Sequence, residues 1–239
     1  MELINGNSIE IFDTVVQSYP ADKIIVVTDP PFNVGYKYKS YKDKMDEASY
    51  YDMLAKFAER FPSAIVHYPE QLFKLAIRIQ RAPEKVVSWV YNSNTAKQHR
   101  DIAFFGVMPD MKKVRQPYKN PNDKRIMERM KNGAGGGRLY DWWNVNQVKN
   151  VSRAKTGHPC QMPVEVMKNV IGILPDDCIV IDPFMGSGTT GVAVEIMNRE
   201  QNACRKFVGI EIDKDYFEIA KARIEQEANP HPQQMRLAV

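Results

Sequence analysis

Short apolar runs alternate with segments of helical periodicity along most of the chain. Runs such as 24–27 and 178–181 are apolar throughout, which predicts buried strands. Segments such as 45–61 place an apolar residue every three or four positions, which predicts amphipathic helices. The predicted strands are 24–27, 63–68, 84–91, 102–107, 178–181 and 207–210, and the predicted helices are 45–61, 70–81, 163–174 and 192–197.

This alternation predicts an α/β fold with a mostly parallel sheet and helices on both faces. The 239 residues are enough for one sizeable domain with a full core, so we expect 1–239 to be a single domain. Neither a signal peptide nor an apolar run of membrane length is visible, and we therefore expect an intracellular, cytoplasmic protein.

Two segments follow strands and carry candidate chemistry. Thr28-Asp29-Pro30-Pro31-Phe32 follows the first strand, and Asp182-Pro183-Phe184-Met185-Gly186-Ser187-Gly188-Thr189-Thr190 follows the strand at 178–181. Ligands of open α/β sheets bind at the carboxyl ends of the strands. We expect one end to accept a planar amine and the other an adenosine-bearing cofactor.

The glycine segment taken alone also fits a dinucleotide site. Residues 186–191 satisfy G-x-G-x-x-G between a strand and a helix, and Glu211 ends the next strand about 20 residues further on. A NAD-dependent oxidoreductase is therefore a competing interpretation. Two observations favour a methyl donor: Asp182 and Phe184 stand where a dinucleotide site usually has apolar residues, and a D-P-P-F segment has no role in hydride transfer. D-P-P-F alone would be a weak signal, since it also suits a rigid turn after a strand.

The pair of segments resembles the motifs of S-adenosylmethionine-dependent DNA amino-methyltransferases, which methylate the exocyclic nitrogen of adenine or cytosine. In that family D-P-P-Y or D-P-P-F is the catalytic motif and F-x-G-x-G the cofactor motif. The order of the two motifs here is that of the β group, which implies a circularly permuted, Rossmann-like methyltransferase fold. Further similarity lies in 3–7, 33–36, 158–163 and 209–223, with Asn7 where the family usually has Asp.

The resemblance implies a role for each matching residue. Asp29, Pro30, Pro31 and Phe32 would be catalytic: the Asp29 carboxylate and the Pro30 carbonyl would accept the amine hydrogens, and Phe32 would stack on a base flipped out of the duplex. The residues implied for S-adenosylmethionine are Asp182, Phe184, Gly186, Ser187, Gly188, Thr189, Glu211, His158 and Pro159. Asp at position 29 favours the N6 amine of adenine, with the N4 amine of cytosine as the alternative.

The positive charge is concentrated in one segment. From 110 to 155 the chain has 12 Lys and Arg against 4 Asp and Glu, a net of +8, whereas the remainder is −4. Proline, a run of glycine and the pair Trp142-Trp143 favour a loop there over a packed element. By itself this composition suits a solvated, partly disordered loop as well as a surface for phosphate contacts. The segment lies where the resembling family has its target-recognition region, so the resemblance implies that 109–156 is an inserted target-recognition segment. The candidate phosphate contacts are Lys112, Lys113, Arg115, Lys119, Lys124, Arg125, Arg129, Lys131 and Arg138.

The expected partner is double-stranded DNA, and a homodimer that shares the DNA contacts is compatible with so short a segment. RNA or protein amides would satisfy the same amine pocket, and a non-catalytic DNA-binding relative is a third interpretation. Cys160, Cys178 and Cys204 are scattered, so we expect no metal site.

Overall fold

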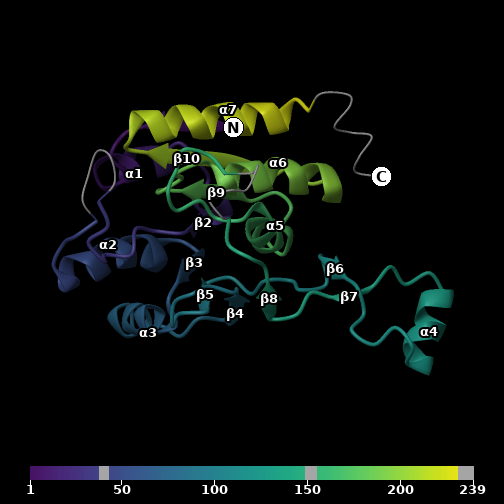
Figure 1. Cartoon of the computed structure of the whole chain (residues 1–239). Helices are drawn as coiled ribbons and strands as arrows, with labels where there is room; N and C mark the ends of the chain where they lie inside the picture. Colours follow the sequence, from purple (N-terminus) through teal and green to yellow (C-terminus); the bar gives the residue numbers. More distant parts are fainter. Residues whose placement is uncertain (38–42, 149–154, 231–239) are drawn as a thin grey trace.

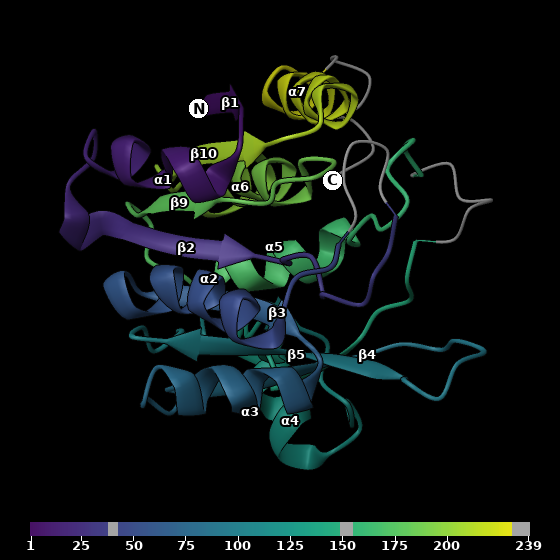
Figure 2. The ribbon, with the colours of Figure 1, turned by 90° about the vertical axis from the view of Figure 1, so that its left-hand side faces the viewer.

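One large sheet organises the computed structural model, which describes residues 1–37, 43–148 and 155–230. Within those residues the sheet has eight strands in the order β1-β10-β9-β2-β3-β5-β4-β8. In that spatial order they are β1 (Glu2–Asn5), β10 (Lys206–Glu211), β9 (Ile179–Asp182), β2 (Ile24–Thr28), β3 (Ser63–His67), β5 (His99–Phe105), β4 (Lys85–Val90) and β8 (Trp142–Asn144). The strand β5 is antiparallel to both neighbours, and the other pairs are parallel (Figure 2).

Helices cover both faces of the sheet, as the alternation of elements predicted. The helices are α1 (Ser8–Val16), α2 (Glu47–Arg60), α3 (Pro69–Arg78), α5 (Val164–Gly172), α6 (Thr189–Gln201) and α7 (Lys214–Ala228). In β2, Ile24 and Val26 pack with Phe12 and Phe57 of α1 and α2, while Ile25 and Val27 belong to the core under α5, α6 and α7. Figure 1 shows α1 to α3 at the left of the sheet and α5 and α6 at the right. Successive residues of a strand point to opposite faces, so a wholly apolar strand serves both layers.

Short polar side chains start several of these helices. The side chain of Asn7 accepts from the Ile9 amide, that of Asp46 from the Ser49 amide, and that of Asp213 from the amides of Asp215 and Tyr216. Such caps satisfy amides that have no partner within the helix. Asn7 therefore starts α1 although the resembling family usually has Asp at that place.

The segment 109–156 contains ordered elements, which corrects the expectation of a loop. Residues Arg115–Gln116 (β6) and Gly137–Arg138 (β7) form a small antiparallel ribbon that leads to the helix α4 (Lys124–Lys131). Figure 1 shows α4 standing away from the body of the molecule. The chain then returns to the sheet, because β8 pairs with β4 and Trp143 is buried. The pattern missed β8 because a three-residue strand carries too little periodicity to be seen.

Within the described residues no helix combines the length and apolar character needed to cross a bilayer. The same residues contain no group of three or more His, Cys, Asp or Glu side chains placed to bind a metal ion.

Candidate active site

The two motif segments meet at the carboxyl ends of adjacent strands. β2 and β9 pair in parallel with Val26 opposite Ile181, so the residues that follow them emerge side by side. Thr28 Oγ1 donates a hydrogen bond of 3.0 Å to Asp182 Oδ1, and both residues are buried. A cavity of about 230 Å³ opens there, lined by 29–32 from one segment and 184–187 from the other.

The Pro31 carbonyl is fixed by a chain of buried hydrogen bonds. The Tyr68 amide donates to His67 Nδ1 at 2.8 Å, and the Tyr50 hydroxyl lies 2.8 Å from His67 Nε2 and donates to the Pro31 carbonyl at 2.7 Å. Burial, together with the charge of the neighbouring Arg100, lowers the pKa of His67 to about 3, so the ring is neutral. A neutral ring that accepts at Nδ1 carries its proton on Nε2, which therefore donates to Tyr50. All donors in this chain point toward Pro31.

The ring of His67 also supports the aromatic residue of the motif. It stacks on Phe32 with centroids 4.3 Å apart and an interplanar angle of 20°. No sequence motif surrounds His67. Its position is at the end of β3, and from there it contacts the motif through both the hydrogen-bond chain and the stack.

Asn33 and Asp43 close the loop that follows the motif. Asn33 has a φ of +57°, a left-handed conformation that Asn tolerates better than most residues. Its side chain bonds the amide and the carbonyl of Met45, and the Asp43 carboxylate accepts from the amides of Asn33 and Val34. These bonds explain why Asn suits position 33. They anchor both ends of the loop beside the cavity.

Asp29 is a partly buried carboxylate that faces one cation. Arg100, at the start of β5, places Nη1 3.7 Å from Asp29 Oδ2, and Asp29 Oδ1 has no hydrogen-bond partner among the described residues. Burial raises the pKa of Asp29 to about 6, and the charge of Arg100 opposes that rise. The carboxylate therefore retains one buried acceptor without a partner, on a residue that lines the cavity.

Asp182 stabilises the glycine turn. Its oxygens accept from the Thr28 hydroxyl, the Thr190 hydroxyl at 2.6 Å and the Phe184 amide at 3.1 Å. Burial raises the pKa of Asp182 to about 6, although these hydrogen bonds oppose the rise. Asp182 lines the cavity, but three groups of the chain already use its carboxylate. We therefore assign it to positioning the turn.

The two glycines of the turn have different surroundings. Gly186 has a φ of +52°, and a Cβ there would lie 3.1 Å from His158 Nε2 at the cavity. Gly188 has a φ of +76°, and a Cβ there would lie 2.9 Å from the Cβ of Ala220 in α7. Gly186 therefore leaves room at the cavity, whereas Gly188 permits the close packing of α7. Gly188 itself does not line the cavity.

Glu211 reaches the same turn from the end of β10. Its Oε2 accepts from the Gly186 amide and its Oε1 from the Asp213 amide, each at 2.9 Å. Glu211 itself does not line the cavity, whereas His158, Phe184, Ser187 and Thr189 do. Pro159 does not line it, and its carbonyl accepts from Lys155 instead.

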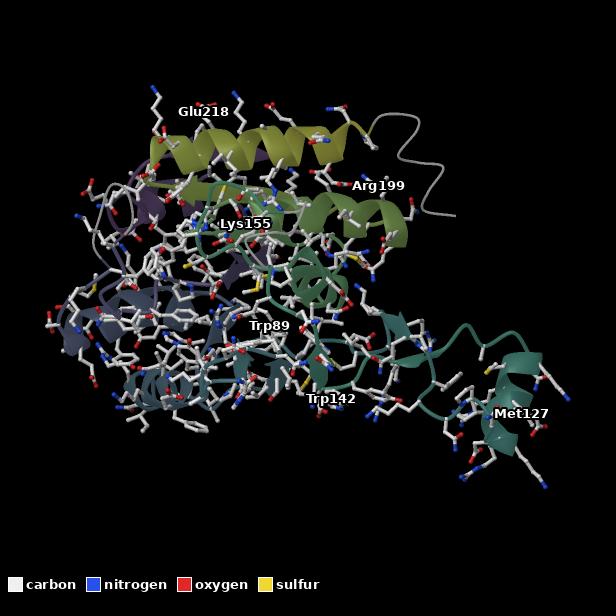
Figure 3. The ribbon with its side chains drawn as sticks, in the orientation of Figure 1. Trp89, Met127, Trp142, Lys155, Arg199 and Glu218 are labelled. Carbon is white, nitrogen blue, oxygen red and sulfur yellow. The ribbon has the colours of Figure 1, made fainter. Side chains whose placement is uncertain are left out.

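The basic residues of the protruding arm, defined as 115–138, are mostly exposed. Arg115 and Arg138 lie directly opposite each other in the β6–β7 ribbon. No residue of α4 is buried, and Figure 3 shows Met127 of that helix far from Trp89 in the body. The candidate contacts that are exposed are Lys112, Arg115, Lys119, Lys124, Arg125, Arg129, Lys131 and Arg138.

Lys113 differs from these residues. Its ammonium bonds the Leu174 carbonyl and forms an ion pair of 2.7 Å with Asp176. It therefore ties the start of the segment to the body. Trp142 is exposed beside Lys119, whose ammonium lies 4.3 Å from the indole centroid, whereas Trp143 packs in the core.

Three residues of the site escaped the sequence patterns. Tyr50 was visible only as an apolar helix position, His67 only as a strand end, and Arg100 lay outside the strand predicted at 102–107. The observed β5 begins at His99. The sequence around Arg100 does not mark it as a site residue, because the residues that it contacts belong to other strands.

The comparisons with known proteins agree with this geometry. The chain matches a family model described as DNA methylase, of the N6/N4 type, over residues 62–222, so the match begins after the Asp29 segment. It is 29% identical to the type II methyltransferase M.ScaI of Streptomyces caespitosus over 95% of this chain and 82% of that protein. It is 24% identical to the DNA adenine methyltransferase YhdJ of Escherichia coli K12 over 88% of this chain and 79% of that protein.

Solved structures share the fold. The cytosine-N4-specific PvuII DNA methyltransferase superposes with a TM-score of 0.64 at 16% identity, covering 99% of this chain and 89% of that one. A putative DNA modification methylase from Thermus thermophilus, complexed with S-adenosyl-L-methionine, gives a TM-score of 0.59 at 16% identity, covering 96% of this chain and 95% of that one. These similarities confirm the Rossmann-like methyltransferase fold.

Proposed function

The chain belongs to the N6/N4 DNA methylase family, and from this premise we propose that it transfers a methyl group from S-adenosylmethionine to the N6 amine of adenine in DNA. The observation that carries the proposal is the free, buried Oδ1 of Asp29. It lies beside a glycine turn at the adjacent strand end, and the Thr28–Asp182 hydrogen bond joins the two segments.

The residues around the turn fit an adenosine-bearing cofactor. Gly186 leaves open the space that a Cβ would fill next to His158, and the Glu211 carboxylate is anchored at the turn with further acceptor capacity for ribose hydroxyls. When bound, S-adenosylmethionine supplies an electrophilic methyl group on a sulfonium. The chain itself has to align the amine with that methyl group and exclude water.

Asp29 and the Pro30 carbonyl are the groups that act on the amine in this proposal. An exocyclic amine is a poor nucleophile because its lone pair is delocalised into the ring. Accepting its two hydrogens favours a pyramidal nitrogen and stabilises the positive charge that develops during attack. The neighbouring Pro31 carbonyl already accepts from Tyr50, which fixes the direction of the chain at this point.

Adenine is the proposed base and N4-cytosine the alternative. Asp at position 29 favours adenine through the resemblance, and the Escherichia coli relative is named a DNA adenine methyltransferase. The alternative has its own support, since the PvuII enzyme that shares the fold is named cytosine-N4-specific. Both amines offer two hydrogens, so Asp29 suits either base. The nicotinamide-dependent alternative finds no support in the family match.

Double-stranded DNA is the proposed substrate because the exposed cations are concentrated on one projecting element. Neutralising phosphates with Lys and Arg releases counterions and provides affinity without regard to sequence. The arm would bind the duplex backbone while a flipped base enters the cavity.

The test is methyl transfer from labelled S-adenosylmethionine to unmethylated DNA, followed by nucleoside analysis and mapping of the modified positions. We expect label in N6-methyladenine, and no transfer by the Asp29→Asn variant, which should still bind the cofactor in calorimetry. If the label is found in N4-methylcytosine alone, the target base is cytosine rather than adenine, and the proposed mechanism still holds. The proposal would be refuted if NADH, and not S-adenosylmethionine, raised the melting temperature of the wild-type protein.

A further inference from the structure

Arg100 is a cation built into the target side of the cavity. Its side chain is only 17% exposed and it lines the cavity with Asp29 and Phe32. The guanidinium carbon lies 4.7 Å from the ring centroid of Phe32, 5.3 Å from that of Trp89 and 5.8 Å from that of Tyr68. Aromatic contacts on this scale help to fix the guanidinium in place. The guanidinium also hydrogen-bonds the Tyr91 side chain.

Asp29 and Arg100 each have one buried polar atom without a hydrogen-bond partner among the described residues. These atoms are Asp29 Oδ1, an acceptor, and Arg100 Nε, a donor. Nearly all buried polar atoms in native proteins are paired, so two orphans on contacting side chains indicate a missing ligand. The ligand must offer a donor to Asp29 and an adjacent acceptor to Arg100.

A flipped amino base offers this pattern on the edge that pairing normally conceals. In adenine the N6 amine is next to the ring nitrogen N1, and in cytosine the N4 amine is next to N3. We propose that Arg100 reads the target base by donating from Nε to this ring nitrogen while Asp29 accepts from the amine. The inference rests on the proposed function and deepens it by naming the residue that recognises the ring.

Donation to the ring nitrogen withdraws electron density from the amine, so Arg100 contributes recognition and alignment rather than activation. The negative charge of the Asp29 carboxylate, next to the amine, has the opposite effect and stabilises the positive charge that develops on the nitrogen. Arg100 must also not occupy the Asp29 oxygen that accepts the hydrogen bond from the amine. Its ion-pair contact to Oδ2 at 3.7 Å leaves Oδ1 available for that purpose.

The test uses duplexes in which the mapped target adenine is replaced by 1-deazaadenine or by 7-deazaadenine. The first lacks N1 and keeps the amine, and the second lacks only N7 of the opposite edge. For the wild type we expect kcat/KM to fall about 10- to 100-fold on 1-deazaadenine, the range of one hydrogen bond to a charged group, and to change little on 7-deazaadenine. If the mapped base is cytosine, 3-deazacytosine takes the place of 1-deazaadenine.

The Arg100→Met variant completes a cycle with the same duplexes at a pH where Asp29 is ionised. We expect it to lose a similar factor on adenine and to show no further loss on 1-deazaadenine. Arg78→Met, on the exposed face of α3, is the matched control and should keep the wild-type discrimination. Equal rates of the wild type on adenine and 1-deazaadenine would overturn the inference, as would a penalty confined to 7-deazaadenine.

The wild-type comparison decides the question even if Arg100→Met does not fold. Failure of this inference is also distinct from failure of the proposed function. In the first case adenine is methylated without regard to N1, and in the second no base in DNA is methylated. A purely structural Arg100 would give a variant that is slower on every duplex by one common factor, with the full 1-deazaadenine penalty intact, and this result would refute base reading.

Discussion

Thr28 and Asp182 are 154 residues apart in the chain and share a buried hydrogen bond of 3.0 Å. Because their strands are neighbours in the sheet, this bond fixes the position of the D-P-P-F segment relative to the glycine turn. The donor and the acceptor of a methyl group must be aligned to within a fraction of an ångström for transfer to be fast. The Thr28 hydroxyl is therefore expected to influence catalysis without touching either substrate.

Thr28→Val keeps the shape of the side chain and removes the hydroxyl. We expect a loss of about 1–3 kcal/mol in the free energy of unfolding, since one buried acceptor position of Asp182 loses its donor. We also expect kcat to fall while the substrate affinities change less. Thr28→Ser, which keeps the donor, is the control, and urea unfolding with steady-state kinetics provides the measurements. Identical kinetics for Val and Ser variants would show that the bond does not align the segments.

Tyr50→Phe removes the last donor in the chain that fixes the Pro31 carbonyl. We expect kcat to fall roughly 2- to 10-fold, the value of one neutral hydrogen bond, with the cofactor dissociation constant unchanged. Tyr51→Phe is the matched control, because the Tyr51 hydroxyl bonds Gln71 on α3 rather than the motif. A Tyr50→Phe protein with wild-type turnover per folded molecule would argue against a positioning role.

Gly186→Ala and Gly188→Ala should have different consequences although both positions have positive φ. The left-handed conformation costs each variant roughly 1–2 kcal/mol. At position 186 the added methyl group meets His158 at the cavity, so we expect weaker binding of S-adenosylmethionine in calorimetry. At position 188 it meets Ala220, so the principal loss should be in thermal stability. Loss of cofactor affinity only in Gly188→Ala would reverse these roles.

The raised pKa of Asp29 predicts opposite effects of pH on stability and activity. The folded state binds this proton more tightly than the unfolded state, with pKa values of about 6 and 3.8. The favourable contribution to stability is thus complete below pH 3.8 and is lost as the pH rises through about 6. Turnover requires the ionised carboxylate and should rise through the same window.

Two variants identify the group responsible. In Asp29→Asn the contribution to stability vanishes, so the stability of the wild type relative to this variant should decline as the pH rises from 3.8 to about 6. Arg100 lowers the pKa of Asp29, so Arg100→Met should move the acid limb of its residual kcat/KM to higher pH. The carboxyl of Asp182, whose pKa is also raised to about 6, does not face Arg100 in this way. An unmoved limb would assign the ionisation to Asp182 or to another group.

The arm should carry the salt dependence of DNA binding. Replacing both Arg115 and Arg138 by Ala removes two exposed cations that lie opposite each other in the ribbon. Like charges in that position repel each other, and a bound phosphate would relieve the repulsion. We expect the slope of log K against log salt to become less steep by roughly two units, measured by fluorescence anisotropy from low to moderate salt.

Lys113→Ala serves as the contrast, because its ammonium is paired with Asp176. We expect reduced stability and an unchanged salt slope. A slope that responds to Lys113 and not to the two arginines would place the DNA on the body of the molecule rather than on the arm.

The fold class, most of the elements and the two motif segments could be predicted from the amino-acid sequence. Apolar runs such as Ile24–Val27 are expected to be buried in any fold. A Gly-rich turn between a strand and a helix is typical of a site where the backbone approaches a ligand closely. Local information of this kind is carried by neighbouring residues, and it also revealed the excess of positive charge in 109–156. The ordered arm inside that segment was not predicted, since proline and glycine indicate turns without saying what the turns connect.

The assembly of the site could not be predicted from the sequence, because it depends on contacts between distant parts of the chain. Arg100, Tyr50 and His67 have no motif around them, and each acquires its function from residues of other strands and helices: Asp29 for Arg100, Pro31 for Tyr50, and Phe32 for His67. The strand order that brings β2 beside β9 and β3 is a long-range property of the sheet. Hydrogen bonds and ion pairs depend on distances of a few ångströms between atoms, and spacing along the chain does not specify those distances.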